Sequence, residues 1–109
     1  MGKNEFEKGM KFSFDNSIAY ADKAVVSKHI LKKQTGNISL FAFDKGEGLS
    51  EHTTPFDALV MVVDGKVDIT IGETSHLLKT GESIIMPANI SHALTAVEKF
   101  KMVLTMIRS

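Results

Sequence analysis

The sequence predicts an all-β domain, a single sandwich or barrel built from short antiparallel strands. Short apolar segments recur at intervals of roughly 8–12 residues, and polar turns separate them. No segment keeps a helical period over three turns. A chain of 109 residues suits one domain, which at this size buries roughly two-thirds of the surface that its unfolded chain exposes.

The N-terminal part, residues 1–22, is the least patterned segment of the chain. Within it Met10, Phe12 and Phe14 alternate with polar residues, which is the period of a strand, and we expect this segment to add a strand to the barrel. Residues 15–28 are the best candidate for a helix. The barrel itself is expected over residues 23–109.

The remaining elements are expected to be strands separated by turns. Their expected ranges are 23–31, 38–43, 59–63, 66–71, 74–79, 83–86, 91–97 and 101–107. Between two of them Asp64 and Gly65 predict a hairpin with a two-residue type I′ turn, because that turn needs a positive φ at both positions. Several strands, such as residues 38–43, are apolar on both faces, which indicates a second sheet, a partner subunit or both.

Composition excludes several classes of function. Thirteen basic residues balance thirteen acidic ones, so neither nucleic acid nor an anionic membrane is an expected partner. The absence of cysteine excludes disulfides, thiolate metal sites and a cysteine nucleophile, and it fits a reducing compartment. No apolar run approaches the roughly 20 residues of a membrane span, and the charged N-terminus lacks a secretory pattern. We therefore expect a cytoplasmic protein.

Two stretches, residues 46–65 and 81–96, carry the most specific pattern. Each has glycine, histidine and turn residues at fixed spacing: Gly46, His52 and Gly65 in the first, and Gly81, Pro87 and His92 in the second. This pattern resembles the two signature motifs of the cupin superfamily, G-x5-H-x-H-x3,4-E-x6-G and G-x5-P-x-G-x2-H-x3-N. The resemblance covers residues 38–107 and implies a double-stranded β-helix, the jelly-roll barrel of small single-domain cupins.

The resemblance also implies a divalent metal site near one mouth of the barrel. In the family, two histidines and a glutamate of the first motif hold the ion with the histidine of the second. Here Thr54 takes the place of the second histidine and Ala58 that of the glutamate, so only His52 and His92 remain. Asp57 lies one residue before the glutamate position, and in a regular strand its side chain would point to the other face. It completes a two-histidine, one-carboxylate site only if the segment before it is a loop or bulge.

Each of these residues also has an alternative interpretation. His52 and His92 can be neutral imidazoles that hydrogen-bond a small molecule in a pocket without metal, with Thr54 and Met61 as further ligand-binding residues. Asp57 can be a solvated loop carboxylate. The methionines of the strands are core filler by default, because methionine adapts to irregular gaps.

Function divides into three classes, of which the first is our main expectation. It is a binding module that takes a small molecule, with a divalent transition metal or none, in the barrel pocket. The second is a metal-dependent dioxygenase, isomerase or epimerase, and the third is a non-catalytic sensor or structural remnant. Small cupins are commonly homodimers that exchange an N-terminal strand, so we expect a homodimer with residues 1–22 as the candidate for exchange.

Overall fold

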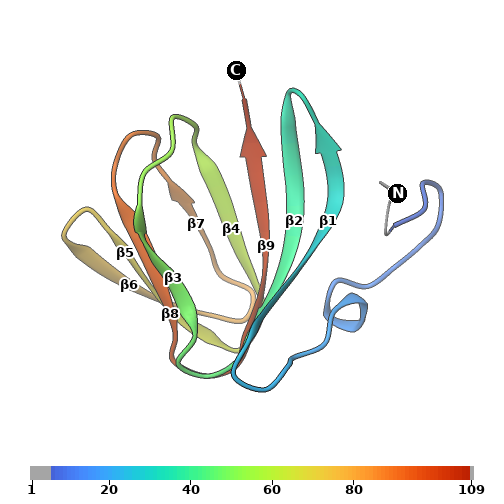
Figure 1. Cartoon of the computed structure of the whole chain (residues 1–109), viewed down its shortest axis with the longest axis horizontal. Coiled ribbons are helices and arrows are strands. Elements are labelled where there is room, and N and C mark those ends of the chain that lie inside the picture. The colour runs from blue at the N-terminus through green and yellow to red at the C-terminus, as the bar shows by residue number, and fades with distance from the viewer. Residues whose placement is uncertain (1–5, 109) are drawn as a thin grey trace.

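The computed structural model describes residues 6–108, and within them nine antiparallel strands form two sheets packed face to face (Figure 1). One sheet has the strand order β1-β2-β9-β4-β7 and the other the order β3-β8-β5-β6. The expectation of an all-β double-stranded β-helix is confirmed. The strands are β1 (Val25–Lys33), β2 (Gly36–Phe43), β3 (Gly48–His52), β4 (Ala58–Asp64), β5 (Lys66–Ile71), β6 (Thr74–Lys79), β7 (Ser83–Met86), β8 (His92–Ala96) and β9 (Phe100–Ile107).

Most strands lie where the sequence predicts them, and β5, β6 and β7 have the predicted bounds. Two predictions for the N-terminal part are wrong, whereas the exchange of residues 1–22 in a dimer stays a prediction. Met10–Phe14 form no strand, and of the helix candidate at residues 15–28 only one 3-10 turn, η1 (Asp15–Ser17), is present. The helix fails because the β-branched residues Val25 and Val26 pair with β2 in a sheet instead.

Gly65 is a corner between the two sheets, so the predicted hairpin is wrong. β4 pairs with β7 and β9, whereas β5 pairs with β6 and β8. Of the two turn residues only Gly65 has a positive φ, +91°, so the turn is not type I′. A Cβ atom on Gly65 would lie 1.8 Å from the carbonyl oxygen of Lys99. The dipeptide signals a turn correctly, but it does not determine which strands pair.

The main core lies between the two sheets and is built from alternate residues of their strands. At its centre Phe43 and Phe100 stack with ring centroids 4.6 Å apart. The other fully buried large side chains that face this core are Val60, Val62, Val67, Ile69 and Met102. This core fixes the strands that carry the site described below.

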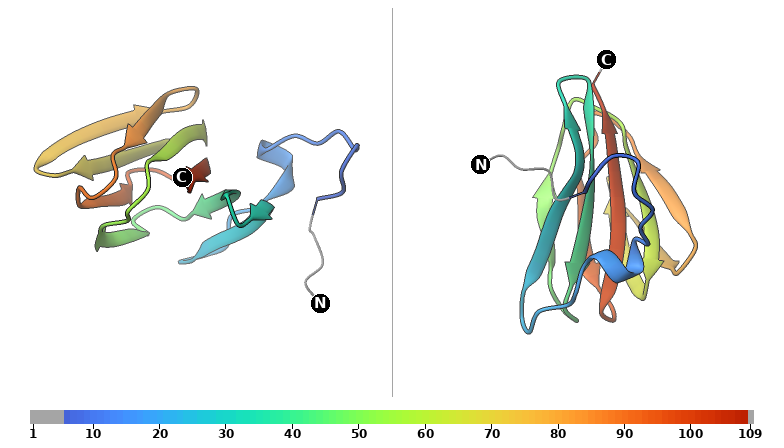
Figure 2. Two further views of the ribbon diagram at one scale, coloured as in Figure 1. Left: turned by 90° about the horizontal axis from the view of Figure 1, so that it is seen from above. Right: turned by 90° about the vertical axis from the view of Figure 1, so that its right-hand side faces the viewer.

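A second cluster lies on the outer face of the five-stranded sheet. Leu40, Ala42 and Val103 are buried there against the N-terminal segment, which contributes Ile18 and Tyr20. Figure 2 shows the course of this segment beside the five-stranded sheet. This contact explains why β2 is apolar on both faces. Within the described residues, the second face is covered by the chain's own N-terminal segment.

Polar contacts hold the N-terminal segment on the sheet. The Tyr20 hydroxyl donates to Oδ2 of Asp64 at 2.5 Å. Lys101 donates to the carbonyl and the carboxylate of Asp15 at 2.6 and 3.0 Å, and its Nζ lies 4.9 Å from the centre of the Tyr20 ring. Burial and then the bond to Asp64 raise the pKa of Tyr20 above its ordinary value.

In the described part of the chain, no helix is long and apolar enough to cross a membrane.

Candidate functional site

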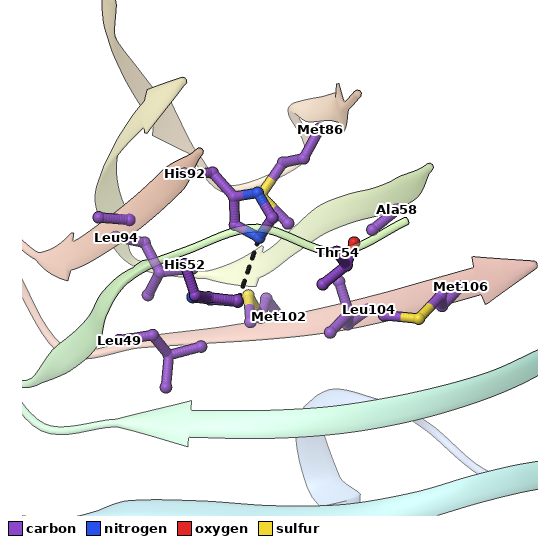
Figure 3. Close-up of a pocket in the computed structure, with 11 residues that line it drawn as sticks. Leu49, His52, Thr54, Ala58, Met86, His92, Leu94, Met102, Leu104 and Met106 are labelled. Carbon is purple, nitrogen blue, oxygen red and sulfur yellow. Dashed lines mark hydrogen bonds between the residues drawn. The ribbon is translucent and has the colours of Figure 1, made fainter. Parts of the chain in front are cut away.

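Two histidines from neighbouring strands meet inside the barrel. His52 is the last residue of β3, His92 is the first of β8, and the two are partners in the strand register. Their Nε2 atoms are 3.2 Å apart and their rings meet edge to face, with centroids 4.4 Å apart (Figure 3). The register of β3 shifts between Leu49 and His52, and both histidine side chains line the same cavity.

The other nitrogen of each ring is held by the backbone. Nδ1 of His52 lies 2.8 Å from the carbonyl oxygen of Ser50, and Nδ1 of His92 lies 3.3 Å from that of Ile90. Because a carbonyl oxygen only accepts hydrogen bonds, each ring can direct an Nδ1–H at its carbonyl. The two Nε2 atoms face each other at hydrogen-bond distance, so one ring can donate to the other, or, with both hydrogens on Nδ1, both lone pairs point at the same place. The latter arrangement is stabilised by a cation or a proton between the rings.

Burial differs between the two rings. His92 is 4% exposed, whereas His52 lies at the surface. Burial lowers the pKa of His92, repulsion from His52 acts in the same direction, and the bond to the Ile90 carbonyl opposes them. The buried ring is therefore held in its neutral form, which is the form that binds a metal.

The cavity around the histidines is small and mostly apolar. Its volume is about 40 Å³, enough for a few water molecules or one ion, whereas sites for drug-sized molecules measure roughly 300–1,000 Å³. The lining combines the two imidazoles, one hydroxyl, aliphatic side chains and three thioethers. The residues are Leu49, His52, Thr54, Ala58, Met86, His92, Ala93, Leu94, Met102, Leu104 and Met106.

The structure brings three of the predicted site residues together, namely His52, His92 and Thr54. The Thr54 hydroxyl donates to the carbonyl oxygen of Phe56 at 2.9 Å, which leaves its oxygen lone pairs available to the cavity. Met61 does not line the cavity. It packs on the opposite face of β4, in the outer cluster beneath the N-terminal segment.

Asp57 also lies away from the histidines, although the segment before it is a loop. Its Oδ1 accepts a hydrogen bond of 2.8 Å from the backbone N–H of Ala88, and it borders a separate apolar groove with Leu59 and Ile85. Across residues 6–108, no three His, Cys, Asp or Glu side chains form a metal-binding group. The two histidines therefore stand without a carboxylate.

Sequence reasoning missed the three methionines of the cavity, which it treated as core filler. Met86 closes β7, and Met102 and Met106 lie on β9. A signal was available, because alternate residues of β9 share one face and Phe100 on that face points into the core. Figure 3 shows the three thioethers extending into the cavity with the two rings.

Comparison with known proteins agrees with the fold. A family model described as the Cupin domain matches residues 39–108. A conserved protein of unknown function from Streptococcus pyogenes is 31% identical, with a TM-score of 0.92 over 97% of this chain and 93% of that one. No curated protein matches the chain.

Two other solved structures are similar. A cupin superfamily protein from Desulfitobacterium hafniense has a TM-score of 0.90 at 24% identity and covers 97% of both chains, which shows the shared fold. A Cupin 2 conserved barrel domain protein from Leptotrichia buccalis is 36% identical with a TM-score of 0.86. That alignment covers 89% of this chain and 47% of the other, so this chain corresponds to about half of that protein.

Proposed function

The chain belongs to the cupin domain family, and from this premise we propose that it is a binding protein in which His52 and His92 hold a transition-metal ion together with a small ligand. The observation that carries the proposal is the convergence of two Nε2 atoms, 3.2 Å apart, in a mostly apolar cavity. With the hydrogen of each ring on Nδ1, a cation between the rings can accept both Nε2 lone pairs.

The two rings fit one metal ion. For bonds of about 2.0–2.1 Å and an angle of about 90–110° at the ion, two nitrogen ligands lie about 2.9–3.4 Å apart, and the observed 3.2 Å falls in this range. Both rings can also direct Nδ1–H at a backbone carbonyl, the outer contact that orients metal-binding histidines. Apart from the two histidines, Thr54 is the polar side chain of the cavity lining that can bind a water or ligand beside the ion.

The size of the cavity limits the ligand. About 40 Å³ admits an ion with water or another ligand of a few atoms, and a larger molecule requires side chains at the mouth to move. His52 is exposed, so ligands reach the ion from its side, while buried His92 forms the inner wall. A bound ion would act as a Lewis acid toward such a ligand.

Binding is favoured over catalysis by the chemistry of the lining. Apart from the two imidazoles, the described lining holds no side chain that exchanges protons near neutral pH, and Asp57 is bound to the Ala88 N–H. An enzyme of this geometry would have to use the same two rings both as metal ligands and as acid and base.

Metal content of the tag-free protein tests the proposal. We expect near-stoichiometric metal in the wild type after dialysis against iron, manganese, nickel, copper and zinc salts, and loss of that metal in His52→Ala and His92→Ala. His76→Ala is the matched control, because His76 lies on β6 outside the cavity and its loss leaves the site intact. The proposal fails if the wild type takes up no metal, or if the two site variants retain as much metal as the control.

A further inference from the structure

We propose that this site selects a soft monovalent cation, copper(I), which the two imidazoles bind together with methionine thioethers. The inference rests on the proposed function, because it requires that His52 and His92 hold a metal ion. It differs from the expectation of a divalent ion. It follows from the residues at and beside Ala58, the position where the family has its glutamate ligand.

Ala58 stands at the position of the family's glutamate, and methionines flank it on both sides. In the five-stranded sheet Ala58 lies opposite Met86 on β7 and opposite Met106 on β9. Neighbouring strands are about 4.8 Å apart, so two thioethers border the place that a carboxylate would otherwise occupy. The alanine methyl group leaves that place open to longer neighbours, and all three residues line the cavity of the histidines.

A third thioether comes from Met102, two positions along the same face of β9 from Leu104 and four from Met106. Met102 is fully buried and Met86 is 4% exposed, so both sulfur atoms are shielded from water. In Figure 3 the three side chains enter the cavity from β7 and β9, while the two histidines enter from β3 and β8. One sheet thus supplies the thioethers and the other the imidazoles.

The charge of the donor set favours a monovalent ion. Imidazoles, thioethers and the Thr54 hydroxyl are all neutral, and no carboxylate of the described residues joins them. By Born solvation the cost of moving an ion from water into an apolar site grows with the square of its charge, so a divalent ion costs about four times as much as a monovalent ion of equal size. A carboxylate would offset part of that difference, and the described lining of the cavity contains none.

The chemistry of the donors points to copper(I) in particular. Thioethers are soft ligands that select Cu(I), and imidazole binds copper as well. Manganese and magnesium prefer carboxylates and water, which the cavity lacks. Methionine has three rotatable side-chain bonds, so the sulfur atoms can adjust to an ion placed by the two rings.

Competition with a chromophoric copper(I) chelator under anaerobic, reducing conditions tests the inference. We expect the wild type to withdraw one equivalent of Cu(I) from the chelator, and Ag(I) to compete for the same site. Met86→Leu and Met106→Leu each remove one thioether at nearly constant volume, and we expect each to weaken Cu(I) binding about tenfold or more. Met61→Leu is the matched control, because Met61 packs on the opposite face of β4, and its affinity should equal that of the wild type.

The outcomes separate this inference from the proposed function. Copper(I) selection is refuted if Met86→Leu and Met106→Leu bind Cu(I) as tightly as Met61→Leu does. It is also refuted if Zn²⁺ or Mn²⁺ binds more tightly than Cu(I) and the affinity for that ion is the same in the methionine variants as in the wild type. In that case loss of metal in His52→Ala and His92→Ala still supports the proposed function. If no ion binds the wild type, both proposals fail. Far-UV circular dichroism checks that each variant is folded.

Discussion

Tyr20→Phe tests whether the N-terminal segment is part of the stable fold. The substitution removes only the hydroxyl group that donates to Asp64 at 2.5 Å. The aromatic ring remains, and with it the packing against the outer face of the sheet and the contact with the Lys101 ammonium group. Any change in stability therefore reports the hydrogen bond that links the segment to the end of β4.

The magnitude follows from the kind of bond. A hydrogen bond to a charged group contributes about 1.5–3 kcal/mol, and partial exposure of both Tyr20 and Asp64 places this bond near the lower value. We therefore expect the free energy of unfolding to fall by about 1.5 kcal/mol. For a domain of this size about 4 °C corresponds to each kcal/mol, so Tm should fall by about 6 °C.

Urea unfolding followed by far-UV circular dichroism measures the effect, and a double-mutant cycle isolates it. Asp64→Ala and the double variant with Tyr20→Phe complete the cycle, and we expect a coupling energy of about 1 kcal/mol or more. The reasoning is refuted if Tyr20→Phe unfolds within about 0.3 kcal/mol of the wild type, or if the two substitutions are additive.

Three further predictions follow from the fold. Gly65→Ala should lower the free energy of unfolding by more than about 2 kcal/mol in the same urea assay, because a left-handed backbone disfavours alanine and its Cβ would lie 1.8 Å from the Lys99 carbonyl oxygen. An unchanged unfolding midpoint would show that the corner can open without cost. Tyr20 is the only tyrosine, and its pKa is raised in the folded protein, so the stability that it contributes is complete below its ordinary pKa of 10 and is lost as the pH rises toward its pKa in the folded state. In a spectrophotometric titration, phenolate absorbance should therefore appear only at pH values above the ordinary pKa of tyrosine. Titration at the ordinary pKa would contradict the docked position of Tyr20. The homodimer remains a prediction, and we place its interface on the outer face of the five-stranded sheet beyond the N-terminal segment, where Ile85 and Ile107 are exposed. Analytical ultracentrifugation should find dimers in the wild type and monomers in Ile85→Lys, and a monomeric wild type would refute the predicted dimer.

The fold was predictable because strand period, turns and the spacing of two histidines all pointed to the same barrel. The pairing of strands was not, since Asp64 and Gly65 mark a turn equally well within a sheet and between two sheets. The N-terminal segment was also misread, because the alternation from Met10 to Phe14 is the same whether the residues pair with a strand or lie against a sheet. Tertiary contact decides between these outcomes.

At the site, the resemblance to the two cupin motifs predicted that His52 and His92 share one pocket, and the structure places them there. The sequence did not identify the methionines, because an apolar inward-facing residue reads as core whether or not a cavity lies beside it. Nor could it place Asp57, whose carboxylate is held by the N–H of Ala88, a residue distant in sequence. Hydrogen bonds between loops depend on how the strands before them are aligned, and spacing does not encode that alignment.

The central place of β9 in its sheet has a consequence for the order of folding. β9 pairs with β2 and β4, and its register joins Ile107 to Gly36 and Met106 to Ala58. Contacts of such long sequence separation form slowly, because the loop must close before the contacts stabilise it. During synthesis the five-stranded sheet therefore stays open until β9 has emerged. Because this strand also supplies two thioethers, the cavity and the closed barrel are completed in the same late step, and a chain without β9 lacks the thioethers of Met102 and Met106.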